Sequence, residues 1–86
     1  MSLDKAKALA ANGRIAEAET LFDALVRAKP KNAVVLSTYV RFHNRYFRKF
    51  RKAAAAVESL VALKPKSAEV QALAAETYSN CKRLAE

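Results

Sequence analysis

The sequence NGRIAEAETLFDALVRAKPKNA, at residues 12–33, contains two helix stops with one amphipathic helix between them. Gly13 can adopt the left-handed conformation that ends a helix, whereas Pro30 cannot continue one. Between these stops, apolar side chains recur every three or four residues, the spacing of one helix face: Ile15, Ala18, Phe22 and Leu25. The other faces are polar, and four side chains are predicted to point outward: Glu17, Glu19, Asp23 and Arg27.

The same pattern returns 35 residues later, with apolar residues at the matching positions Phe50, Ala53, Val57 and Leu60. The exit turn is also repeated, because the Lys-Pro-Lys at 29–31 recurs at 64–66. A period in the thirties indicates a repeat of stacked helix pairs. The chain shows no alternation of apolar and polar residues typical of strands. The sequence therefore predicts an all-α fold.

Five helices are expected in a single domain, residues 1–86. The first starts near Leu3 and ends before Asn12-Gly13, and the others span 15–28, 33–46, 49–63 and 68–81. Asn32 and Ser67 are the predicted N-caps of the third and fifth helices. In the third helix, the residues predicted to face the core are Leu36, Tyr39, Val40 and His43. In the fifth, they are Val70, Leu73, Ala74, Tyr78 and Cys81.

The chain is basic, with a net charge of +8 from sixteen Lys and Arg against eight Asp and Glu. No acidic residue occurs between Ala24 and Val57. Segment 39–52 also mixes aromatic with basic residues, and it contains a basic patch at Arg48, Lys49, Arg51 and Lys52. Such a charge suits nucleic acid, an anionic surface or an acidic protein, although a solvated basic surface has the same composition.

Few of the residue types needed for catalysis are available. Cys81 is the only cysteine and His43 the only histidine, which excludes an intrachain disulfide and most familiar metal sites. The sequence contains no glycine-rich phosphate loop and no nucleophile motif. It also has no apolar run long enough to span a membrane and no signal peptide. We therefore expect a cytoplasmic non-enzyme without a cofactor. The residues at both ends are typical of a piece cut from a longer protein.

These motifs resemble the tetratricopeptide repeat, a 34-residue helix–turn–helix unit. The signature of the second helix in that unit matches Gly13, Ile15, Ala18, Phe22 and Pro30, and again Phe50, Ala53, Val57 and Pro65. The resemblance implies two repeats, about 1–32 and 33–67, followed by a terminal helix at about 68–81. It further implies a short right-handed superhelix of antiparallel helix pairs, in which small residues lie at close helix crossings: Ala18, Ala53 and Ala75.

In this family the first helix of each unit lines a concave surface that binds a partner. The corresponding polar residues here are Lys7, Ser37, Thr38, Arg41, Asn44, Arg45 and Glu76. The family's clamp for a C-terminal carboxylate is absent, since its positions hold Leu3, Lys7, Thr38, Glu69 and Leu73. An acidic or polar extended peptide is the partner that this surface would accept.

The resemblance thus implies a protein–protein interaction or scaffold module. Self-association as a homodimer is part of this expectation, because two repeats and one helix leave an apolar end to be covered. Two alternatives stay open at this point. One is binding of nucleic acid or another polyanion through segment 39–52. The other is a regulatory repeat segment of a larger enzyme.

Overall fold

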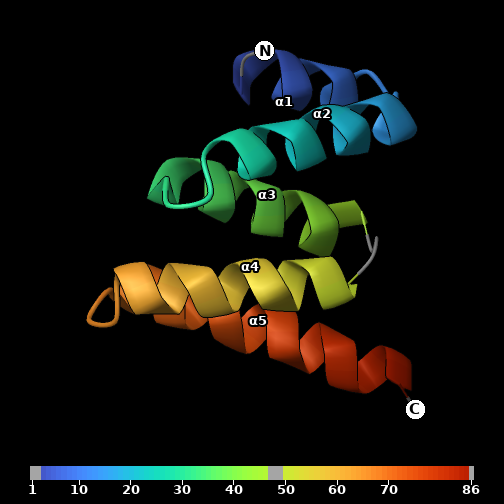
Figure 1. Cartoon of the computed structure of the whole chain (residues 1–86). Helices are drawn as coiled ribbons and strands as arrows, with labels where there is room; N and C mark the ends of the chain where they lie inside the picture. The colour runs from blue at the N-terminus through green and yellow to red at the C-terminus, as the bar shows by residue number, and fades with distance from the viewer. Residues whose placement is uncertain (1–2, 47–49, 86) are drawn as a thin grey trace.

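Five α-helices make up the part of the chain that this computed structural model describes, residues 3–46 and 50–85 (Figure 1). They are α1 (Leu3–Ala11), α2 (Ile15–Ala28), α3 (Ala33–Tyr46), α4 (Phe50–Leu63) and α5 (Ala68–Ala85). These residues contain no strand, which confirms the all-α prediction. Within them, no helix is both long and apolar enough to cross a membrane.

The helix bounds follow the stop signals closely, with one exception at the C-terminal end. α5 continues to Ala85, four residues beyond the predicted end at Cys81. No glycine or proline follows Cys81, and the next residues are good helix formers. The predicted start of the fourth helix, Lys49, lies outside the described residues.

The turns after α2 and α4 repeat one hydrogen-bond pattern. In the first, Lys29 N donates to Leu25 O at 2.9 Å and Asn32 N donates to Lys29 O at 3.2 Å. The second turn has both bonds at the same lengths 35 residues later, from Lys64 N to Leu60 O and from Ser67 N to Lys64 O. The sequence repeat is therefore also a repeat of backbone structure.

Side chains cap the helices that follow these turns. Asn32 Oδ1 accepts a hydrogen bond from Val35 N at 3.1 Å, and Ser67 Oγ accepts one from Val70 N at 3.2 Å. Each cap satisfies an N–H group that has no partner within its helix. At the end of α1, Gly13 has a φ of 82°, and Arg14 N donates to Leu9 O at 2.9 Å. The predicted caps and the glycine stop are confirmed.

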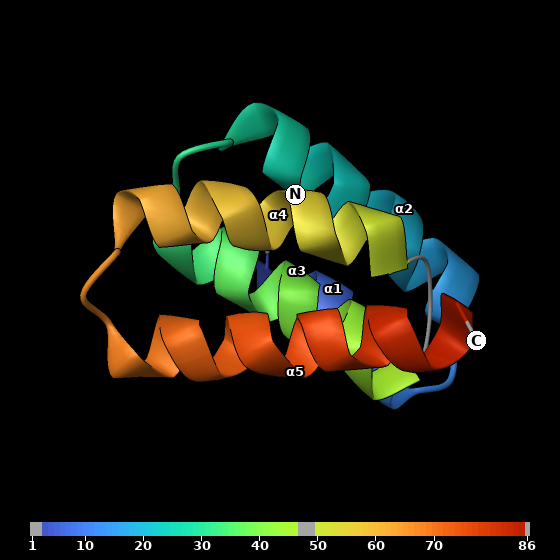
Figure 2. The same ribbon diagram turned by 90° about the horizontal axis from the view of Figure 1, so that it is seen from below.

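Consecutive helices pack against one another to form a layered stack. α1 packs on α2, α3 on α4 and α4 on α5, and α3 also contacts α2 and α5. Figure 1 shows this order from the N-terminal to the C-terminal end. Figure 2 shows α2 and α4 towards one side and α3 and α5 towards the other.

The buried residues lie mainly on the faces that the spacing predicts. Ala18, Ala53, Val40, Val57 and Leu60 are fully buried. His43 is also fully buried, with its ring centroid 4.5 Å from that of Tyr39 and 5.2 Å from that of Phe42. The prediction that His43 faces the core is confirmed.

Two helices bury a polar residue that was not among their predicted core positions. On α2, Glu19 is 7% exposed, so the prediction that it points outward is wrong. On α5, Thr77 is buried, whereas Tyr78 is 46% exposed and Ala75 is also exposed. The packed face of α5 is therefore Val70, Leu73, Ala74 and Thr77, and the predictions for Tyr78 and Ala75 are wrong. On α5, Thr77 lies on the side that faces α3, where it accepts a hydrogen bond from Asn44.

Candidate functional site

A hollow of about 500 Å³ lies among α1, α2 and α3. Three cationic residues line this hollow: Lys7 from α1, and Arg41 and Arg45 from α3. Thr38, Arg41, Phe42 and Arg45 follow the spacing of three and four residues, so α3 presents all of them on one face. The remaining lining residues are Ala10, Ala11, Phe22 and Tyr46.

Three aromatic rings that contact one another form the floor of this first hollow. The ring centroid of Phe42 lies 4.8 Å from that of Phe22 and 5.4 Å from that of Tyr46. The hydroxyl of Tyr46 donates a hydrogen bond of 3.3 Å to Ala10 O and so ties α3 to α1. Arg45 lies over the Tyr46 ring, with 5.7 Å between its guanidinium carbon and the ring centroid. Phe22 and Phe42 are 1% and 4% exposed, so the half-buried Tyr46 is the ring of this floor that a ligand can reach, beneath the cationic rim.

A second hollow of about 350 Å³ adjoins the first, and the two share Thr38 and Arg41. It lies between the first half of α3 and the start of α5. Apolar lining comes from Ala33, Val34 and Val70, and polar lining from Ser37, Lys64, Ser67 and Glu69. We call the two hollows together the α3 groove.

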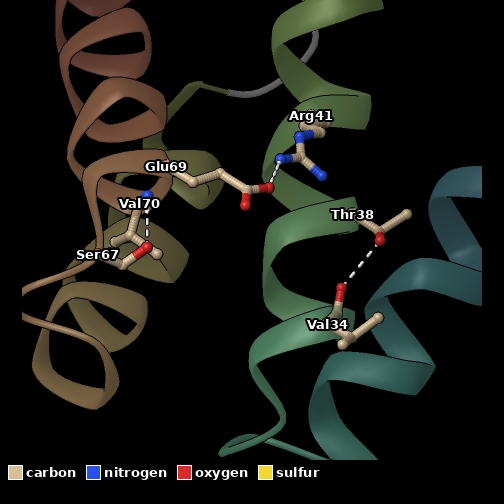
Figure 3. A network of polar contacts seen from close by, with 6 residues as sticks. All are labelled: Val34, Thr38, Arg41, Ser67, Glu69 and Val70. Carbon is tan, nitrogen blue, oxygen red and sulfur yellow. Dashed lines mark hydrogen bonds and ion pairs between the residues drawn. The ribbon is translucent and has the colours of Figure 1, made fainter.

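Arg41 is one of the two residues that line both hollows, and Figure 3 shows Glu69 reaching it from α5. Arg41 Nη2 and Glu69 Oε1 form an ion pair and hydrogen bond, with 52% and 72% of the two side chains exposed. Nearby, the Thr38 hydroxyl donates to Val34 O at 2.8 Å. The hydroxyl hydrogen of Thr38 is therefore already donated to an acceptor within α3.

The α3 groove is positively charged. Its lining contains Lys7, Arg41, Arg45 and Lys64. Among the described residues that line the two hollows, Glu69 is the only carboxylate. The groove therefore combines excess positive charge with an apolar floor.

The structure brings together most of the residues predicted for the concave surface. Lys7, Thr38, Arg41 and Arg45 line the first hollow, and Ser37 lines the second. Glu76 is exposed on α5 and lines neither hollow. The sequence analysis did not assign Phe22, Phe42 and Tyr46 to this surface. The i, i+4 spacing of Phe42 and Tyr46 shows that they share a helix face, but it does not show that this face lines a hollow.

Asn44 was predicted to face a partner, but it is only 4% exposed. Its Nδ2 donates a hydrogen bond of 2.9 Å to Thr77 Oγ1, and the Thr77 hydroxyl donates in turn to Leu73 O at 2.9 Å. Asn44 therefore joins α3 to α5 inside the protein. Its assignment to the partner-binding surface is corrected.

The predicted basic patch is only partly available to a ligand. Arg48 and Lys49 lie outside the described residues, and Arg51 is exposed. Lys52 Nζ forms an ion pair of 2.9 Å with Asp23 Oδ2, and the Tyr39 hydroxyl donates to Asp23 Oδ1 at 2.9 Å. Lys52 is therefore part of a network that connects α2, α3 and α4. Asp23 was predicted to point outward, but it is half-buried in this network.

This network changes the acidity of two of its members. Burial alone would raise the pKa of Asp23, but the hydrogen bonds from Lys52 and Tyr39 and the charge of Lys52 outweigh burial and lower it. Burial raises the pKa of Tyr39, and its hydrogen bond to Asp23 raises it further. The phenol thus stays a donor and the carboxylate an acceptor. A third hollow, of about 410 Å³, lies next to these groups on the side of α2 and α4.

Within residues 3–46 and 50–85, no cluster of three or more His, Cys, Asp or Glu side chains could hold a metal ion. Comparison with known proteins gives no further guidance: no protein-family model, curated protein or solved structure matches this chain.

Proposed function

We propose that this chain is a non-catalytic, tetratricopeptide-like module that binds an extended acidic segment of another protein in the α3 groove. The observation that carries the proposal is the position of Lys7, Arg41 and Arg45 around an aromatic floor. Cations on a rim attract and orient an acidic partner, while contact with the floor contributes about 25 cal/mol per Å² of apolar area removed from water.

Each of the two hollows has room for side chains of such a ligand. The two hollows have volumes of about 500 and 350 Å³, and pockets for small ligands have about 300–1,000 Å³. Because the hollows share Thr38 and Arg41, an extended segment can contact both. A non-catalytic role is consistent with His43, which is fully buried and out of reach of a substrate.

Nucleic-acid binding through segment 39–52 is less favoured. Tyr39 and Phe42 are 5% and 4% exposed, so neither ring is free to stack on a base. Lys52 is already paired with Asp23. A role as a regulatory segment of a larger enzyme is compatible with the same groove, since a binding module serves equally well there.

Fluorescence polarisation with a labelled peptide tests the proposal. The probe is Glu-Leu-Ser-Glu-Ser-Leu-Glu, blocked at both ends, and its counterpart has Gln at every Glu position. We expect the acidic peptide to bind and the counterpart to bind at least tenfold more weakly. The double variant Lys7→Ala/Arg45→Ala should weaken binding of the acidic peptide about tenfold.

The matched control is Lys29→Ala/Lys31→Ala, which removes two charges from the exposed turn between α2 and α3. It should change the affinity less than twofold. Equal losses in the two double variants would mean that net charge, not the groove, attracts the peptide. Tighter binding of a labelled oligouridine than of the acidic peptide would also contradict the proposal.

A further inference from the structure

We propose that Glu69 is a built-in competitor for the α3 groove: its carboxylate occupies the place on Arg41 that a carboxylate of the ligand takes. This inference rests on the proposed function and specifies its ligand. The expected ligand is an extended segment in which an acidic side chain lies between two apolar side chains on the same face.

Arg41 lines both hollows of the α3 groove. Its side chain therefore borders two sites with apolar lining, and Figure 3 shows its guanidinium paired with Glu69 from α5. On one side are the rings of Phe42 and Tyr46, and on the other are Val34 and Val70. A carboxylate bound to Arg41 would therefore have an apolar site on each side.

The offset between the two hollows along α3 sets the spacing of the side chains that a ligand can place in them. An extended segment rises about 3.3 Å per residue and places alternate side chains on one face. The α3 residues that line the hollows shift from 33–41 to 38–46, which is about 7.5 Å along the helix axis. Side chains two residues before and two residues after the acid lie on the same face as the acid, each about 6.6 Å from it, which is close to this shift. The pattern is therefore Leu-x-Glu-x-Leu.

A ligand carboxylate can displace Glu69 from its ion pair with Arg41. With 52% and 72% of the side chains exposed, water reaches both partners. Exposed ion pairs contribute little to stability, so exchanging one carboxylate for another has a small cost. Glu69 also comes from α5, whereas Arg41 comes from α3, so the pair crosses the groove. A ligand carboxylate that binds Arg41 at Nη2 must replace Glu69.

The test compares Glu69→Gln with the matched control Glu58→Gln, which removes the same charge from an exposed position on α4. Two probes are used: Glu-Leu-Ser-Glu-Ser-Leu-Glu, blocked at both ends, and the same peptide with only its central Glu changed to Gln. We expect Glu69→Gln to bind the first peptide about threefold more tightly than Glu58→Gln does. The difference should disappear with the second peptide, and Arg41→Ala should bind both peptides equally.

Circular dichroism checks that each variant keeps its helices. If Glu69→Gln and Glu58→Gln bind the first peptide equally while Lys7→Ala/Arg45→Ala weakens it, the competitor role is overturned and the groove is retained. If the threefold gain is equal for both peptides, Glu69 does not compete with the central acid, and the inference is again overturned. If no form of the protein binds either peptide, both the inference and the proposed function fail.

Discussion

Asn44 and Thr77 form a buried hydrogen bond of 2.9 Å that joins α3 to α5. Thr77 is fully buried and Asn44 is 4% exposed, so water cannot replace a lost partner. We predict that Thr77→Val lowers the free energy of unfolding by about 1–2 kcal/mol, because it leaves the Asn44 amide buried without this acceptor. Urea denaturation followed by circular dichroism measures the change.

Thr77→Ser, which keeps the hydroxyl, is the control and should lose about 1 kcal/mol or less, the contribution of one methyl group. The double variant Asn44→Leu/Thr77→Val separates pairing from packing. Its loss should be smaller than the sum of the two single losses, since removing both polar partners leaves neither unsatisfied. Additive losses would contradict a direct bond between these residues.

Asp23 gives the protein a specific response to acid. The pKa of this carboxyl is lowered from its ordinary 3.8, so near that pH the folded state binds fewer protons than the unfolded state. Its contribution to stability is complete above the ordinary pKa and is lost as the pH falls through the lower pKa of the folded state. We predict that Asp23→Asn loses about 1 kcal/mol at pH 7 and depends less steeply on pH below about 4. Urea denaturation at pH 2–7 measures both.

The control is Glu58→Gln, which removes the same charge from an exposed side chain and should keep the steep dependence at acid pH. Tyr39→Phe removes only the phenol hydroxyl and should lose about 1 kcal/mol at pH 7. A Tyr39→Phe variant as stable as the wild type would show that the hydrogen bond to Asp23 contributes nothing.

The sequence could predict the helices because their ends depend on local chemistry. Gly13, Pro30 and Pro65 stop helices wherever those helices pack, and Asn32 and Ser67 cap the next ones through their own side chains. The shift of 35 residues then predicted that both turns have the same structure. None of these inferences needs knowledge of the tertiary structure.

The sequence could not predict whether residues at the edge of an apolar helix face are buried or exposed. Glu19, Asn44 and Thr77 lie next to strongly apolar positions, and whether they are buried depends on which helix covers that edge. A single sequence gives the face but not the neighbour that covers it. The same limit applies to the candidate site. The cations Lys7, Arg41 and Arg45 were predicted together, whereas the hollow that forms beneath them depends on how α1 packs.

Gly13 tests how much the backbone conformation of a single residue contributes to the stability of the fold. Its φ is 82°, and a Cβ at this position would have no atom within 4 Å. Any effect of Gly13→Ala therefore comes from the backbone and not from a clash. We predict a loss of about 1 kcal/mol in the free energy of unfolding, because alanine disfavours the left-handed region. Thermal and urea denaturation measure it.

Gly13→Asn is the matched variant, because asparagine tolerates this conformation better than alanine does. It should be closer to the wild type than Gly13→Ala. If the two variants were equally stable, the left-handed backbone would not be the cause of the loss.

The caps of α3 and α5 test whether the two halves of the repeat are equivalent in energy as well as in geometry. Asn32 accepts from Val35 N at 3.1 Å and Ser67 accepts from Val70 N at 3.2 Å, and both side chains are half-buried. We predict that Asn32→Ala and Ser67→Ala each lose about 1 kcal/mol, and that the double variant loses the sum. Additivity follows because the caps share no hydrogen-bond partner. Urea denaturation of the wild type, the two single variants and the double variant measures these losses. Ser59→Ala is the control, because the exposed Ser59 hydroxyl donates within α4 to Ala55 O and caps no helix. Unequal losses would mean that the two turns, although alike in their hydrogen bonds, are held by different surroundings.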